Sequence, residues 1–240
     1  MFKSTTLIKV LNYKTNKPTL ICFPFAGGYS SSFIELSNYL KEDFTVLAIE
    51  PPGHGTNRME LMDNLDDLVN IYYEALFPYL KDPFILFGHS MGGLVSYLLA
   101  IKMKQGNLKA KKIIISACFP PNVRMAAKSS LNDKDFSEYL HSIGGIPDLI
   151  FKNKELMTFF LPAFRADFRS LETFKCLHDE FVETPIYIFN GKEDLEIYKK
   201  EKDWEKWGNV EGYRHFDAGH MFINTEAIKV SEQIKKLLEF

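Results

Sequence analysis

Short apolar runs recur along this 240-residue chain, and most of them end at a proline or a glycine. Within each run the apolar residues are continuous rather than alternating with polar ones. That pattern is typical of strands buried on both faces, as in a parallel sheet. The runs that we predict to be strands are Thr19–Phe23, Thr45–Ile49, Phe84–Phe87, Lys112–Ser116, Pro185–Phe189 and Tyr213–Phe216.

Helix-like segments separate these runs. The stretch from Asn64 to Leu80 has apolar residues at helical spacing, and Gly92–Lys104 is mostly apolar, as expected for a helix packed on a sheet. Alternating strands and helices predict a doubly wound α/β sheet. The length suits one α/β domain, so we interpret residues 1–240 as a single domain. Further helices are predicted at Ser32–Leu40 and Thr225–Leu238.

The composition excludes several classes of protein. The formal net charge is −2 and there is no long run of lysine and arginine, so nucleic acid is a poor candidate for a partner. The N-terminus lacks the pattern of a signal peptide, and no apolar run approaches the ~20 residues that cross a membrane. The three cysteines, Cys22, Cys118 and Cys176, lie far apart without metal-type spacing. We expect reduced, mostly buried thiols in a cytoplasmic protein.

The segment Phe87–Gly93 reads Phe-Gly-His-Ser-Met-Gly-Gly and places Ser90 in a Gly-x-Ser-x-Gly pattern. It lies between a predicted strand and a predicted helix, which is the context of the nucleophile elbow in the α/β-hydrolase fold. The turn strains the serine backbone, and side chains two residues away on either side would clash. We therefore predict an α/β-hydrolase, with a mostly parallel central sheet, helices on both faces and Ser90 as nucleophile. A glycine-rich turn without catalysis is the alternative.

A serine nucleophile needs an imidazole to take its proton and a carboxylate to hold that imidazole. In this fold the three residues follow the chain order Ser, Asp or Glu, His. His220 is the predicted base because it lies on a loop between the last predicted strand and the last predicted helix. Chain order excludes His54 and His89. The remaining histidines are His141 and His178, between the fourth and fifth predicted strands, and His215, inside the last apolar run.

The acid is expected on the loop that follows the fifth predicted strand. This loop, Asn190–Leu195, reads Asn-Gly-Lys-Glu-Asp-Leu. We predict Asp194 as the acid, with Glu193 as the alternative. Asp217 is the least favoured carboxylate, and its expected role is to cap its own loop.

Acyl transfer places negative charge on a carbonyl oxygen, which two backbone N–H groups usually stabilise. One donor comes from the residue after the nucleophile, Met91, and the other from the loop after an earlier strand. Here that loop is Phe23–Gly28, and we assign its donor to Phe25, with Ala26 as a close alternative. A glycine turn that merely opens the next helix would explain the same residues.

Residues 120–183 lack a good strand and interrupt the alternation. The region holds eight of the 21 phenylalanines, at positions 136, 151, 159, 160, 164, 168, 174 and 181. Such a helical insertion predicts a lid over an apolar acyl chain. The alternative is a small subdomain whose rings fill only its own core. The predicted helices are Asp133–Ser142, Pro147–Asn153, Lys154–Phe160 and Ala163–Lys175.

Several segments together resemble the type II thioesterases, stand-alone enzymes that accompany nonribosomal peptide and polyketide synthetases. The resemblance covers nearly the whole chain. Many relatives carry arginine where this chain has His54, whereas the Pro-Gly-His-Gly version resembles the branch that serves the surfactin synthetase. The segments are Phe23–Gly28 (Phe-Pro-Phe-Ala-Gly-Gly), Glu50–Gly55 (Glu-Pro-Pro-Gly-His-Gly), Phe87–Gly93, Phe160–Phe168 (Phe-Leu-Pro-Ala-Phe-Arg-Ala-Asp-Phe), Phe189–Asp194 and Phe216–Phe222.

The resemblance implies that Ser90, Asp194 and His220 hydrolyse acyl thioesters on the phosphopantetheine arm of carrier domains. Removing misprimed acyl groups restores a blocked synthetase. It also implies transient contact with carrier domains, a monomer, and no metal or bound cofactor. Two other functions are alternatives. A carboxylesterase or lipase usually carries a His-Gly type loop where this chain has Phe23–Gly28, and a non-catalytic binding module does not need the ordered catalytic set.

Overall fold

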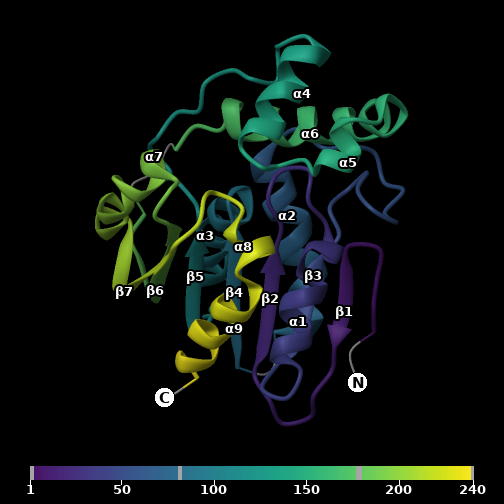
Figure 1. The fold of residues 1–240 in the computed structure, drawn as a ribbon. Coiled ribbons are helices and arrows are strands. Elements are labelled where there is room, and N and C mark those ends of the chain that lie inside the picture. The colour runs from purple at the N-terminus through teal and green to yellow at the C-terminus, as the bar shows by residue number, and fades with distance from the viewer. Residues whose placement is uncertain (1–2, 81–82, 177–179, 239–240) are drawn as a thin grey trace.

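A computed structural model describes residues 3–80, 83–176 and 180–238. Its centre is a seven-stranded sheet with the order β1-β3-β2-β4-β5-β6-β7 (Figure 1). All neighbouring strands are parallel except β1, which pairs antiparallel with β3. The strands are β1 Ile8–Asn12, β2 Thr19–Phe23, β3 Thr45–Ile49, β4 Phe84–His89, β5 Lys112–Ser116, β6 Val182–Gly191 and β7 Gly208–Phe216.

The edge strand β1 was not predicted. Only Ile8 of its five residues is buried, and the rest are half-buried. The strand pairs with β3 alone, so it does not need the continuous apolar run of a strand buried on both faces. Its mixed sequence therefore carries little strand signal.

Helices cover both faces of the sheet, because alternate strand residues point to opposite sides. Leu20 and Cys22 of β2 pack beneath α1 and α9, whereas Ile21 and Phe23 pack with α2 and α3. Helices α1 and α9 lie side by side on one face, as α2 and α3 do on the other (Figure 1). Their bounds are α1 Ile34–Leu40, α2 Leu65–Leu76, α3 Met91–Gln105, α8 Phe222–Thr225 and α9 Ala227–Lys236.

The predicted insertion lies between β5 and β6 in the chain. It contains α4 Asp133–Ser142, α5 Asp148–Phe151 and α6 Lys154–Thr173, which lie beyond the carboxyl ends of the central strands (Figure 1). The prediction of two helices around Pro162 was wrong, because α6 is continuous. Proline removes one backbone hydrogen bond. Burial of one face, which includes Met157, Leu161, Phe164 and Phe168, holds the helix together.

The phenylalanines of the insertion lie in different environments, and Phe159 and Phe181 are exposed. Phe136 and Phe168 pack edge to face inside the insertion, with ring centroids 5.4 Å apart. Phe168 and Phe174 also line a large cavity next to Ser90. The insertion therefore has its own small aromatic core and also forms one wall of that cavity. Within the described ranges, no helix is both long enough and apolar enough to cross a membrane.

Candidate active site

Ser90 lies in the sharp turn between β4 and α3. Its backbone has φ 54° and ψ −118°, a strained conformation for a residue with a side chain, and its N–H donates to the Ser116 carbonyl over 2.7 Å. A Cβ on Gly88 would stand 1.9 Å from the Gly92 oxygen, and one on Gly92 would stand 2.0 Å from the Phe23 oxygen. Both contacts are with backbone, so the turn requires glycine at these two positions, as the motif predicts.

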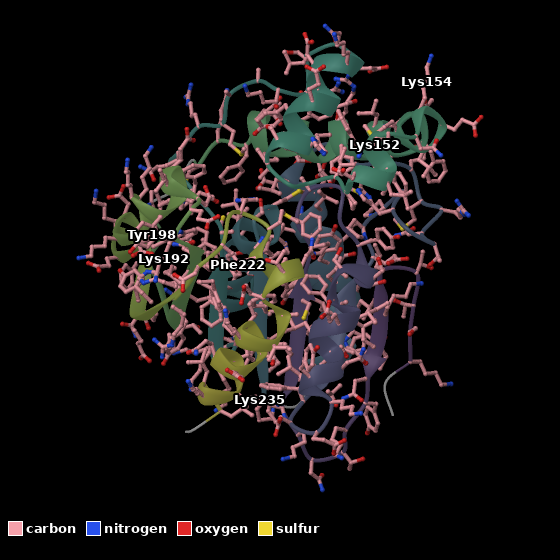
Figure 2. All side chains as sticks on the ribbon, viewed as in Figure 1. Lys152, Lys154, Lys192, Tyr198, Phe222 and Lys235 are labelled. Carbon is pink, nitrogen blue, oxygen red and sulfur yellow. The ribbon has the colours of Figure 1, made fainter. Side chains whose placement is uncertain are left out.

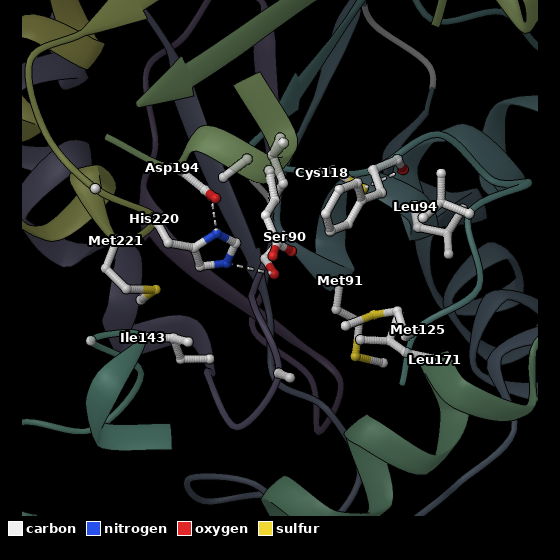
Figure 3. Close-up of a pocket in the computed structure, with 18 of the residues that line it drawn as sticks. Ser90, Met91, Leu94, Cys118, Met125, Ile143, Leu171, Asp194, His220 and Met221 are labelled. Carbon is white, nitrogen blue, oxygen red and sulfur yellow. Dashed lines mark hydrogen bonds and ion pairs between the residues drawn. The ribbon is translucent and has the colours of Figure 1, made fainter. Parts of the chain in front are cut away.

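The three predicted catalytic side chains meet at this turn (Figure 3). The ring of His220 lies between Asp194 and Ser90, with Nδ1 2.6 Å from Asp194 Oδ2 and Nε2 3.0 Å from Ser90 Oγ. An ionised carboxylate only accepts hydrogen bonds, so Nδ1 carries the proton and Nε2 accepts from the Ser90 hydroxyl. This is the tautomer that a general base for Ser90 needs.

The structure also separates the three candidate acids. Asp194 precedes the short helix α7 Leu195–Tyr198. Both Asp194 and Glu193 line the cavity, and it is the Asp194 carboxylate that bonds to the imidazole. The carboxylate of Asp217 pairs with Lys192 at the surface, in place of the expected loop cap. A Cβ on Gly191 would stand 2.4 Å from the Ala218 and Gly219 oxygens, so glycine lets the acid loop pack against the base loop.

His89 supports the base, a role that the sequence did not suggest. It is fully buried, and its Nε2–H donates to the backbone carbonyl of His220 over 3.0 Å, while Nδ1 accepts from the Ser116 hydroxyl at 2.8 Å. Burial, with the neighbouring His220, lowers the pKa of His89 well below its usual value, so the ring stays neutral. The rings of Phe222 and His89 pack edge to face, with centroids 5.1 Å apart, and Phe222 belongs to the C-terminal part of the chain, drawn in yellow (Figure 2).

The other three described histidines pair with carboxylates other than Asp194. His141 pairs with Asp148 in the insertion, and His215 pairs with Glu201. His54 is buried against Asp167. His178 lies outside the described residues. Within the described ranges, His, Cys, Asp and Glu side chains form no group of three suited to a metal ion.

Of the predicted oxyanion donors and their alternative, Met91 and Ala26 line the cavity beside Ser90. Met91 is the first residue of α3, where helical N–H groups have no partner within the helix. Residues Phe25 to Gly28 form a turn closed by a hydrogen bond from Gly28 N to Phe25 O over 2.8 Å. Ala26 lines the cavity together with Ser90 and Met91. This position favours Ala26 over Phe25 as the second donor. The choice between Phe25 and Ala26 stays a prediction.

A cavity of ≈ 770 Å³ opens beside Ser90. Leu94, Met125 and Leu171 lie on one side of the serine, and Ile143 and Met221 lie on the other (Figure 3). Cys118 is a buried wall residue, and burial raises the pKa of its thiol to about 12, so it is a neutral part of that wall. The site joins a serine that is hydrogen-bonded to an imidazole to a mostly apolar chamber.

Comparison with known proteins identifies the family. The model of the thioesterase domain matches residues 18–238. The gramicidin S biosynthesis protein GrsT of Aneurinibacillus migulanus is 33% identical over 228 residues, which cover 92% of this chain and 89% of that protein. The chain belongs to the thioesterase family. This thioesterase is therefore a hydrolase that acts on thioesters.

Solved structures extend the similarity to the whole fold. The type II thioesterase BorB from the borrelidin biosynthetic cluster has a TM-score of 0.90 and 25% identity, and the match covers 100% of both chains. YbtT, a type II thioesterase from the yersiniabactin NRPS/PKS pathway, has a TM-score of 0.86 and 28% identity, with 96% of this thioesterase and 97% of YbtT covered. The expected α/β-hydrolase fold and the resemblance to type II thioesterases are confirmed.

Proposed function

We propose that this thioesterase releases aberrant acyl groups from the phosphopantetheine thiol of carrier domains, and so regenerates a misprimed nonribosomal peptide or polyketide synthetase. The observation that carries the proposal is the hydrogen-bonded set of Asp194, His220 and Ser90 beside a large, mostly apolar cavity. The relatives support the substrate class. YbtT is a type II thioesterase from an NRPS/PKS pathway, BorB is a type II thioesterase from the borrelidin biosynthetic cluster, and GrsT is a gramicidin S biosynthesis protein.

The proposed first step is acylation of the enzyme. His220 Nε2 takes the proton of Ser90 while Oγ attacks the thioester carbonyl, and Asp194 stabilises the imidazolium that forms. The negative oxygen is held by the N–H of Met91 and a second N–H from Phe25 or Ala26. The C–S bond then breaks, His220 returns its proton to the leaving thiolate, and the acyl group stays on Ser90.

Hydrolysis completes the cycle. A water molecule attacks the acyl-serine carbonyl while His220 accepts its proton, and the same N–H groups hold the second oxyanion. Collapse of this intermediate releases the carboxylic acid, and the proton on His220 returns to Ser90 Oγ. We propose that the enzyme needs no metal or bound cofactor of its own, because the carrier domain brings the phosphopantetheine.

We further propose that the enzyme contacts carrier domains transiently and acts as a monomer in the cytoplasm. The buried thiols of Cys22 and Cys118 suit a reducing compartment. A carrier domain would present its arm to this cavity, which the insertion and the base loop both line. Tyr139 and Ile143 of the insertion line the cavity together with Met221.

The substrate class is tested by comparing three donors of one acyl group: an acylated carrier domain, the free acyl-pantetheine thioester and a p-nitrophenyl ester. We expect kcat/KM to be at least about 10-fold higher for the carrier domain than for the ester, because contacts remote from the reacting carbonyl assist catalysis. Equal or faster ester hydrolysis would instead indicate a carboxylesterase. A fluorophosphonate that fails to label Ser90 would indicate a binding module.

The cavity predicts how acyl length is accommodated. We assign the acyl chain to the side of Ser90 lined by the apolar side chains of Leu94, Met125 and Leu171, because the opposite side also carries the polar groups of His220 and Asp194. We expect Leu171→Trp to lower kcat/KM for an octanoyl carrier domain by about 10-fold or more, and to change the value for an acetyl carrier domain little. The control is Ile143→Trp on the opposite side. If only that variant selects against octanoyl, the chain lies on the other side.

A further inference from the structure

Asp167 is a buried carboxylate that lies outside the catalytic set. It belongs to α6 of the insertion and is 3% exposed. Its Oδ2 accepts a hydrogen bond from the backbone N–H of Gly27 over 2.7 Å, and it lies 3.1 Å from His54 Nε2. Burying a carboxylate costs free energy unless its oxygens have hydrogen-bond or ionic partners. Gly27 and His54 are such partners for Asp167.

Gly27 is the third residue of the turn from Phe25 to Gly28. That turn also carries the N–H groups of Phe25 and Ala26, the two candidate oxyanion donors. Gly27 has φ +77°, and a Cβ on it would stand 2.2 Å from the ring of Phe164, three residues before Asp167 on α6. One face of α6 therefore contacts this turn twice, through the ring of Phe164 and through the carboxylate of Asp167.

The carboxylate also borders the space behind the candidate oxyanion hole. A small internal space of ≈ 10 Å³ is lined by Asp167, Phe25 and Met91, among other residues. Asp167 thus lies directly behind both proposed donor segments and does not face the chamber beside Ser90. Its position suits a group that supports the donors and has no contact with the reacting carbonyl.

His54 is the second partner of this carboxylate. Its Nδ1–H donates to the Pro52 carbonyl over 2.9 Å, which fixes the ring. Burial tends to lower the pKa of His54, but Asp167 outweighs it, with help from the Pro52 carbonyl and Glu50, and the pKa lies above its usual value. Glu50 in turn accepts hydrogen bonds from the backbone and hydroxyl of Thr56, which anchors the loop that carries His54.

We propose that Asp167 is a positioning residue that sets the oxyanion turn through the Gly27 N–H, with His54 fixing its carboxylate. The proposal rests on the serine mechanism above and assigns to α6 a part in catalysis beyond covering the acyl chain. An oxyanion donor is effective only when it lies close to hydrogen-bonding distance from the developing negative oxygen. A turn released from α6 would shift its donor, and the loss would fall on the transition state more than on substrate binding.

The test compares three substitutions at this position. Asp167→Leu has a similar volume but no acceptor, and we expect kcat to fall by about 10- to 100-fold with KM within about twofold. Asp167→Asn keeps an oxygen that can accept from Gly27, and we expect kcat to stay within about threefold. Asp167→Ala also lacks the acceptor and gives a second measurement should the leucine variant not fold. Labelling of Ser90 by a fluorophosphonate should slow in parallel with kcat, because its phosphonyl oxygen occupies the same hole.

Glu172 provides a matched control on the same helix. It accepts hydrogen bonds from the backbone N–H groups of Lys128 and Ser129, away from the oxyanion turn. Glu172→Leu should lower the unfolding midpoint while leaving kcat within about twofold. A folded Asp167→Leu or Asp167→Ala enzyme with wild-type kcat would overturn the proposal, as would an asparagine variant as slow as the leucine one. Ser90→Ala is assayed beside the Asp167 variants. An active Ser90→Ala enzyme would show that the serine mechanism itself is wrong. If Ser90→Ala is inactive, the kinetics of the Asp167 variants test the role of Asp167 alone.

Discussion

Ser90→Ala is expected to lower kcat for an acylated carrier domain by at least about 10⁴-fold. Alanine removes the hydroxyl oxygen that lies 3.0 Å from His220 Nε2, so no acyl-enzyme can form on this residue. Binding should change little, because the cavity walls are untouched. The measurement is single-turnover hydrolysis, together with mass spectrometry of the intact protein, which should show an acyl adduct on the wild-type enzyme and none on the variant.

The control for this substitution is Ser96→Ala on the same helix. Ser96 is buried, and its hydroxyl donates to the Gly92 carbonyl over 2.9 Å. Its loss should reduce stability by about 1 kcal/mol while leaving kcat within about twofold. If Ser90→Ala retained more than one hundredth of the wild-type rate, the serine mechanism would be wrong.

Asp194→Asn is expected to reduce kcat by about 10⁴-fold with little change in the fold. The amide lacks the negative charge that stabilises the imidazolium of His220. The amide N–H can also donate to Nδ1 of His220, which places the ring proton on Nε2. A protonated Nε2 cannot accept the proton of Ser90. Steady-state kinetics at pH 7 measure the loss, and circular dichroism confirms that the variant is folded.

Two neighbouring carboxylates serve as controls for this assignment. Glu193 lines the cavity, and Asp217 pairs with Lys192 at the surface. Glu193→Gln and Asp217→Asn should each keep kcat within about threefold. A larger loss for Glu193→Gln than for Asp194→Asn would transfer the role of the acid to Glu193.

The central strands were predictable because a strand buried on both faces has a continuous run of apolar residues. The runs Thr19–Phe23, Thr45–Ile49 and Lys112–Ser116 coincide with β2, β3 and β5. The later strands begin earlier than their apolar runs, since β6 starts at Val182 and β7 at Gly208. Their first residues alternate in burial or lie partly exposed, so their composition does not distinguish them from loop.

The catalytic set was predictable for a different reason. Ser90 belongs to a local motif whose glycines are dictated by backbone contacts, and the fold gives Asp194 and His220 a place in chain order. Even the choice of Asp194 over Glu193 depended only on position in a short loop. What the residues alone left open was the second oxyanion donor, because Phe25 and Ala26 are adjacent on one turn.

The motif around Ser90 by itself predicted the elbow and a serine nucleophile, and chain order predicted Asp194 and His220 as its partners. Only the tertiary structure showed that His89 holds the backbone of His220 and that Asp167 holds Gly27. These contacts join residues 131 and 140 positions apart. No periodicity or local spacing links such residues. A buried histidine or carboxylate acquires its role only when folding removes water and leaves one backbone group within reach.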